Sequence, residues 1–82
     1  MSVKPLRPDL VKYLEKHNLK KKFDKQIDIF KKNPRYPSLN TEILDPKHLR
    51  IYSFRINKKY RAIFIFITSE EIEIVDINDH YQ

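Results

Sequence analysis

The 82-residue chain contains no cysteine and no glycine. Without cysteine it can form neither a disulfide nor a thiolate metal site. Without glycine it cannot form the glycine-rich loop that binds nucleotide phosphates in many enzymes, so we expect no nucleotide cofactor. Its three histidines are not accompanied by clustered carboxylates, which argues against a zinc site. We therefore expect neither a cofactor nor a metal.

Long apolar runs are also missing. No stretch reaches the length needed to span a membrane, and the first residues lack the pattern of a signal peptide. We expect a cytoplasmic protein without a membrane partner. A chain of this length can bury one modest core, so residues 1–82 are expected to form a single domain.

Basic residues are abundant and unevenly distributed. The chain has 17 Lys and Arg against 11 Asp and Glu, which gives a net charge of +6. All Lys and Arg lie before residue 62, whereas the segment after it contains only acidic charges. The positive electrostatic potential of such a basic region favours a polyanionic partner such as RNA, or an acidic protein. A lysine-rich solvated surface would explain the same composition.

The first half of the chain predicts two helices. Pro8 suits the first turn of a helix whose apolar residues recur at helical spacing up to Asn18, which can end it. A second helix is predicted from about Leu19 to Asn33, with its apolar residues on one stripe. Residues 2–7 could form a short edge strand before them.

The second half predicts three strands, at Ile51–Asn57, Tyr60–Ile67 and Glu71–Asn78, after a loop at residues 34–49. The first strand alternates apolar and polar side chains, and the nearly continuous apolar run of the second indicates a central strand covered on both faces. Short connections favour antiparallel hairpins. The predicted fold is an α+β domain, with an N-terminal helical hairpin packed on an antiparallel β-sheet.

The strands also hold a candidate site for RNA phosphate chemistry. Arg55 and Arg61 flank one hairpin turn, and His80 follows the third strand. Antiparallel pairing returns the end of that strand to the start of the second, so the three side chains can converge. Arginine binds phosphate, histidine transfers protons near neutral pH, and Tyr81 can stack on a base. The alternative is structural: the arginines pair with acidic residues of the third strand, and the terminal histidine is solvated.

Metal-free RNA cleavage needs a base for the 2′-OH, a cation for the charged transition state and an acid for the 5′-leaving oxygen. Arg61 is the candidate for the transition-state charge, Arg55 for positioning the phosphate, and His80 for proton donor or base. Several lysines are candidates for contacts with the RNA backbone. They are Lys21, Lys22, Lys25, Lys58 and Lys59.

The order of these parts resembles the RelE/ParE superfamily, the toxins of type II toxin–antitoxin modules. Two basic helices, Pro37-Ser38-Leu39, an Arg-Ile strand, a Tyr-Arg-x-Ile-Phe strand and a terminal His-Tyr pair follow one another. The resemblance covers about residues 10–82 and is strongest from Pro37 to Tyr81. It implies a RelE-like fold, an endoribonuclease that inhibits translation by cutting mRNA on the ribosome without a metal, and an antitoxin partner.

The resemblance also bears on the general base. In ribonucleases of this superfamily the base is a glutamate just before a Pro-Leu pair, whereas this chain has Pro37-Ser38-Leu39 there and no glutamate. Glu42 is the nearest substitute. Two other functions remain open. One is a non-enzymatic inhibitor like the ParE branch that poisons DNA gyrase, and the other is a catalytically inactive module that binds RNA or an antitoxin.

Overall fold

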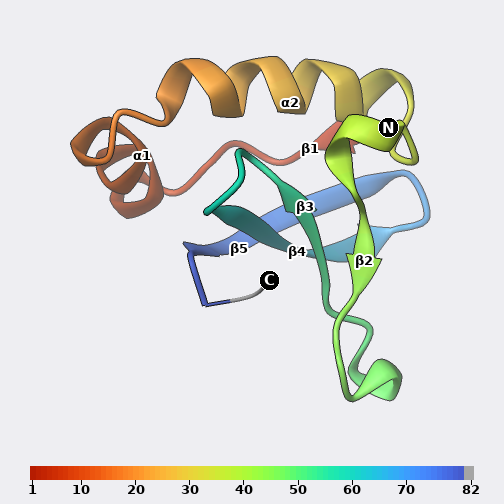
Figure 1. Ribbon diagram of the computed structural model, residues 1–82. Helices are drawn as coiled ribbons and strands as arrows, with labels where there is room; N and C mark the ends of the chain where they lie inside the picture. The colour runs from red at the N-terminus through yellow and green to blue at the C-terminus, as the bar shows by residue number, and fades with distance from the viewer. Residues whose placement is uncertain (81–82) are drawn as a thin grey trace.

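The computed structural model describes residues 1–80 and has two helices on one face of a five-stranded sheet (Figure 1). Its helices and strands are β1 (Ser2–Val3), α1 (Pro8–Lys16), α2 (Lys20–Lys32), β2 (Glu42–Ile43), β3 (Tyr52–Arg55), β4 (Arg61–Thr68) and β5 (Glu71–Asn78). Two 3-10 turns, η1 (Pro37–Leu39) and η2 (Lys47–Leu49), lie between α2 and β3. The predicted α+β fold is confirmed. No helix within residues 1–80 is long and apolar enough to cross a membrane.

The strands are arranged in the order β1-β5-β4-β3-β2. The three long strands form the predicted antiparallel meander, and β1 joins β5 in parallel. The loop predicted at residues 34–49 is wrong in part, because β2 lies within it and pairs with β3, with Glu42 opposite Ser53. A strand of two residues is too short to show a period in the sequence. The edge strand predicted within residues 2–7 is likewise reduced to Ser2–Val3.

The core lies between the helices and the sheet and is centred on phenylalanine rings. The ring of Phe54 is 5.4 Å from that of Phe30 and 5.9 Å from that of Phe64, and all three side chains are almost fully buried. Both helical stripes point into this core, as predicted. Their buried apolar residues are Leu10, Leu14, Phe23, Ile27 and Phe30.

The central strand β4 is only partly covered. Its first four residues, Arg61–Phe64, are buried, but Phe66 and Ile67 are 41% and 44% exposed. The prediction that both faces are covered is therefore wrong for the second half of the strand. The apolar run indicates residues that can be buried, but it does not specify what covers them, and both helices lie on one face (Figure 1).

Left-handed backbone positions occur without glycine. Asn18, Asn40 and Arg50 have φ angles of 57°, 44° and 54°. Asparagine tolerates this conformation better than most residues, because its side chain can hydrogen-bond locally. Asn18 follows the end of α1, as its sequence position predicts, and Asn40 ends η1.

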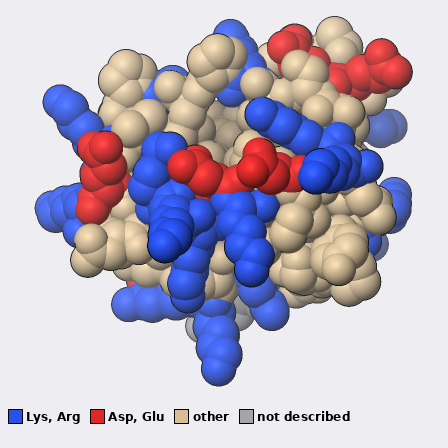
Figure 2. Space-filling view, turned by 90° about the horizontal axis from the view of Figure 1, so that it is seen from above, with Lys and Arg blue, Asp and Glu red and all other residues tan. Residues whose placement is uncertain are grey.

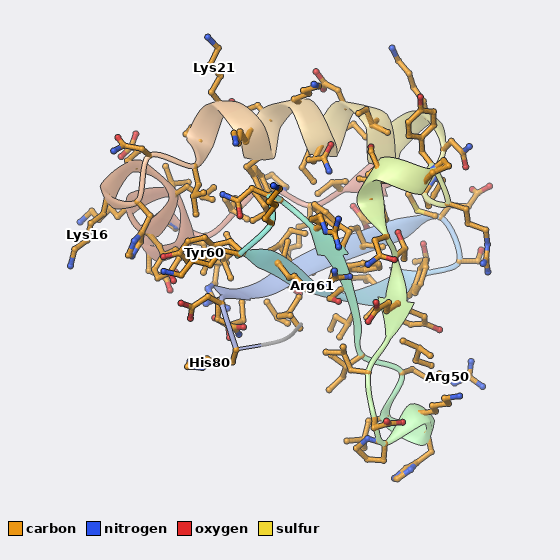
Figure 3. The ribbon with its side chains drawn as sticks, viewed as in Figure 1. Lys16, Lys21, Arg50, Tyr60, Arg61 and His80 are labelled. Carbon is orange, nitrogen blue, oxygen red and sulfur yellow. The ribbon has the colours of Figure 1, made fainter. Side chains whose placement is uncertain are left out.

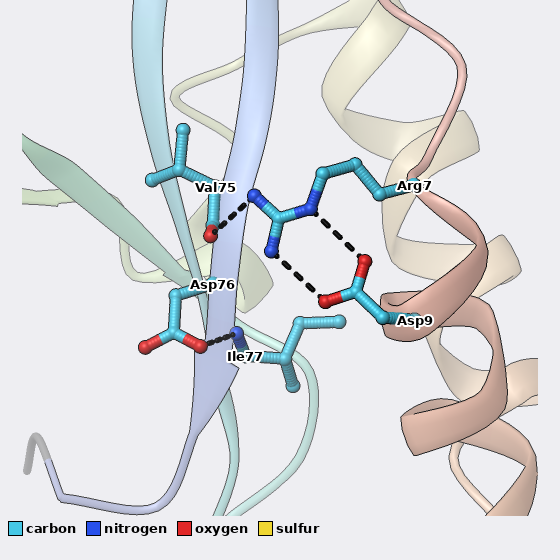
Figure 4. Close-up of polar contacts among 5 residues, drawn as sticks. All are labelled: Arg7, Asp9, Val75, Asp76 and Ile77. Carbon is cyan, nitrogen blue, oxygen red and sulfur yellow. Dashed lines mark hydrogen bonds and ion pairs between the residues drawn. The ribbon is translucent and has the colours of Figure 1, made fainter.

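A side-chain bridge joins α1 to β5 where the sheet is irregular (Figure 4). The register of β5 shifts between Ile63 and Phe64 of β4, which makes Val75 the extra residue of a β-bulge. Arg7 Nη1 donates to the Val75 carbonyl at 3.2 Å, and Arg7 also forms two hydrogen bonds with Asp9, at 3.0 and 3.1 Å. The bridge supplies a partner to the bulged residue and positions the start of α1.

We expect Phe54→Ala to destabilise the fold by about 3–5 kcal/mol, because it leaves a cavity between Phe30 and Phe64. Phe66→Ala is the matched control and should cost much less, since Phe66 is 41% exposed. Urea unfolding of the two variants measures the difference. Equal losses would contradict the placement of the core.

Candidate active site on the open face of the sheet

The sheet face opposite the helices, called the open face below, carries most of the predicted site. Arg55 lies directly opposite Arg61 on β4, and Glu42 lies opposite Ser53. Residues opposite one another on neighbouring strands point to the same side of a sheet. Since Phe54 points into the core, its neighbours in β3 and their partners point to the open face.

Arg61 lies at the centre of this face and is buried, with 4% of its surface exposed. Its Nε donates a 2.8 Å hydrogen bond to Ser53 Oγ, and its Nη2 donates to the carbonyls of Asn40 and Ser53. Among the hydrogen bonds of Arg61 within residues 1–80, none involves Nη1. The guanidinium is therefore fixed through Nε and Nη2.

Neither Arg61 nor Arg55 forms an ion pair within residues 1–80, so the alternative of salt bridges to β5 is not found there. Burial lowers the pKa of Arg61, the nearby Glu42 carboxylate raises it, and Arg55 lowers it. Arginine stays charged under any such shift. A buried charge without an ionic partner is costly, so binding an anion there would be favoured.

Glu42, the candidate base, is exposed on β2, and its negative charge raises the pKa of Arg61. One of its oxygens accepts a 3.3 Å hydrogen bond from Asn40 Nδ2. Asn40 therefore contacts both Glu42, through its side chain, and Arg61, through its carbonyl. Neither Asn40 nor Ser53 was predicted as a site residue. Ser53 could have been found because it alternates with Phe54 on the strand that carries Arg55.

His80 lies on the same side of the sheet but does not meet Arg61. Asn78 pairs with Arg61, as antiparallel pairing predicted, and the His80 amide donates to Asn78 Oδ1 at 3.1 Å. The imidazole is exposed and points away from Arg61 (Figure 3). It has no hydrogen bond within residues 1–80, so it can turn. Tyr81 lies outside the described residues.

Basic side chains gather on the helical side of the molecule (Figure 2). Among the lysines predicted to bind RNA, Lys22, Lys25 and Lys58 line a groove at the edge of β3. Lys21 points away from the sheet (Figure 3). Lys59 lies on the β3–β4 turn and forms an exposed ion pair with its Nζ 3.8 Å from a carboxylate oxygen.

The loop between β2 and β3 carries further exposed cations. Residues 44–51 project from the body of the molecule on the side away from the helices (Figure 1). Lys47, His48 and Arg50 are exposed there. Sequence reasoning assigned His48 to a loop without a function and did not single out the other two. Within residues 1–80, no cluster of His, Asp and Glu could hold a metal ion.

No protein-family model matches the sequence, and neither does any curated protein. Solved structures do match it. A YoeB/ParE toxin from Agrobacterium tumefaciens superposes with a TM-score of 0.72 at 17% identity, over 99% of this chain and 100% of that one. A chain of the heterotetrameric YoeB–YefM toxin–antitoxin complex from Staphylococcus aureus gives 0.69 at 22% identity, over 98% and 94%. A Staphylococcus aureus YoeB dimer gives 0.65 at 22%, with the same coverage.

The chain has the fold of these toxins. The resemblance to the RelE/ParE superfamily is thereby confirmed at the level of the fold. The matched chains agree with this one over nearly its whole length, so the fold includes both the open face and the helices that cover the opposite side. At identities of 17% and 22%, the structural similarity establishes a shared fold and does not establish a shared activity.

The burial of Arg61 leads to a test of its role in stability. Ser53→Ala should destabilise the protein by about 1–3 kcal/mol, because a buried charged donor loses its acceptor. Arg61→Met should cost less, because it removes the buried charge and Asn40 is exposed enough for water to replace the lost bond. Urea unfolding gives both values. The reverse order would show that Arg61 is a structural cation.

Proposed function

We propose that this chain is the toxin of a type II toxin–antitoxin module and inhibits translation by cutting mRNA without a metal, on the ribosome. The similar solved chains include a YoeB toxin in complex with the antitoxin YefM, which supports an antitoxin partner. The net charge of +6 supports a polyanionic substrate and an acidic partner.

The observation that carries the proposal is the environment of Arg61. Its charge is buried and fixed by hydrogen bonds, is not neutralised by an ion pair within residues 1–80, and adjoins a second arginine and a carboxylate. A cation held in this way needs little reorganisation when negative charge develops next to it. In many enzymes such preorganised charge contributes more to the rate enhancement than any other effect.

The proposed reaction is an attack by the 2′-OH of RNA on the adjacent phosphorus. Glu42 accepts the proton of the 2′-OH, and the new O–P bond forms as the bond to the 5′-oxygen breaks. Arg61 stabilises the charge on the phosphoryl oxygens, while Arg55 positions the phosphate. His80, turned toward the open face, donates a proton to the leaving 5′-oxygen. Tyr81 stacks on a base next to the cut.

The products would be a 2′,3′-cyclic phosphate and a free 5′-OH. The exposed position of His80 fits a group that takes its final place only when RNA is bound, because candidate catalytic groups often align only in the substrate complex. The exposed cations of residues 44–51 would lie beside RNA that occupies the open face.

The proposal predicts that Arg61→Met and Glu42→Gln each reduce mRNA cleavage by about 10²-fold or more, with the fold intact. Lys16→Met is the matched control, since Lys16 is an exposed cation on α1 that points away from the sheet (Figure 3). Cleavage is followed on mRNA in a translation reaction, with thermal melting in parallel. If folded Arg61→Met cuts as fast as Lys16→Met, the catalytic role of Arg61 is wrong.

His80→Ala tests the acid separately. A general acid imposes a loss of activity at high pH on the reaction it assists, so removing it should lower the rate and abolish that loss. A rate–pH profile of parent and variant measures this. A variant with lower activity but an unchanged high-pH limb would mean that another group donates the proton.

A further inference from the structure

A second cationic site lies at the edge of β3. A groove of about 320 Å³ is formed there by α2, η1 and the β3–β4 turn. Lys22 and Lys25 of α2, Arg55 at the end of β3 and Lys58 of the turn line it, and none of its lining residues is acidic. The groove opens beside α2, on the side of the molecule where Lys and Arg gather (Figure 2).

One buried side chain fixes the walls of the groove. Gln26 of α2 is buried, and its Nε2 donates to the carbonyl of Ser38 in η1 at 3.2 Å and to the carbonyl of Arg55 at 2.7 Å. The pairing of β2 with β3 covers only Tyr52 and Ser53, so the Arg55 carbonyl would otherwise be unpaired at a sheet edge. The groove is therefore a preformed feature.

The cations around the groove are available to a ligand. Within residues 1–80, Lys22, Lys25 and Lys58 form no ion pairs. Asn57 also lines the groove, and its carboxamide oxygen accepts hydrogen bonds from two turn amides, at 2.9 and 2.8 Å. Several like charges facing one concave surface create a positive potential that favours an anion.

The composition of the groove favours RNA backbone over an acidic protein segment. Protein segments usually bind through apolar anchors buried in pockets, and the groove has a single apolar lining residue, Ile56. Phosphate recognition needs only cations and polar donors, which make up nearly all of the remaining lining.

The groove and the open face have one residue in common, Arg55. Arg55 lines the groove and lies directly opposite Arg61 across the β3–β4 pair. An RNA strand with a phosphate at Arg61 can therefore pass Arg55 and cross the edge of β3 toward Lys22 and Lys25. We propose that the groove binds backbone phosphates of the substrate RNA strand next to the cleaved nucleotide. This inference rests on the proposed function and adds the path of the substrate.

The test compares two pairs of lysines on the same helix. Lys22→Gln/Lys25→Gln removes two charges from the groove, whereas Lys31→Gln/Lys32→Gln removes two exposed charges from the last turn of α2, outside it. The probes are 2′-O-methyl RNA oligonucleotides of about four and about twelve nucleotides, within the range of single-strand site sizes. They cannot be cut because the 2′ nucleophile is blocked. Binding is measured over a range of salt concentrations.

We expect the groove variant to lose about tenfold or more in affinity for the longer probe, with a salt slope smaller by about 0.7 for each lost phosphate contact. The shorter probe, which the open face alone can hold, should bind nearly as before, and the control pair should change neither value strongly. Thermal melting confirms that both double variants fold.

Three outcomes would overturn the inference. The first is an equal loss in the control pair, which would mean a general charge effect. The second is loss of binding to purified ribosomes with no loss for the longer probe, which would assign the groove to ribosomal RNA. The third is loss of binding only to polyglutamate, which would assign it to an acidic protein. If the parent protein cuts no RNA but the expected losses occur, the proposed function fails while the groove remains an RNA site.

Discussion

The guanidinium of Arg61 is held in the interior by hydrogen bonds and without an ion pair in the described chain, and the open face is arranged around it. Ser53 on β3 and the carbonyl of Asn40 supply acceptors on two sides. The pairing of β2 with β3 then sets Glu42 next to Ser53. A charge held in this way costs stability, and a bound anion would offset that cost. The same constraint explains why the site consists of one buried cation surrounded by exposed groups.

The rest of the fold keeps this arrangement rigid in a small chain without disulfides. The phenylalanine cluster beneath β3 and β4 supports the strands that carry Arg55 and Arg61. Arg7 secures the bulged part of β5, and Gln26 secures the edge of β3. Because Gln26 binds the backbone of Arg55, the same contact that closes the sheet edge also shapes the cationic groove. Arg55 is thus common to the open face and to the groove at the edge of β3.

The sequence could predict those helices and strands whose apolar residues recur at a regular spacing. The helical stripes and the three long strands extend over enough residues to show one, and the return of β5 to Arg61 follows from antiparallel pairing. The strand β2 could not be predicted, because a two-residue strand exists only through its pairing with β3. The contact between Arg61 and Asn40 depends on a left-handed residue in an irregular loop. The direction of the His80 side chain could not be predicted, because His80 lies beyond the end of β5, where no strand pattern applies.

If the open face promotes attack by the 2′-OH of RNA, the ends of each cut strand must carry the products of that attack. The purified protein is added to a translation reaction, and both ends of each cut mRNA are identified. We expect a 2′,3′-cyclic phosphate upstream and a 5′-OH downstream, and no cut where the upstream nucleotide is 2′-deoxy. A 3′-OH with a 5′-phosphate would indicate attack by water and would contradict the account, as would mRNA that stays intact in the presence of active, folded protein.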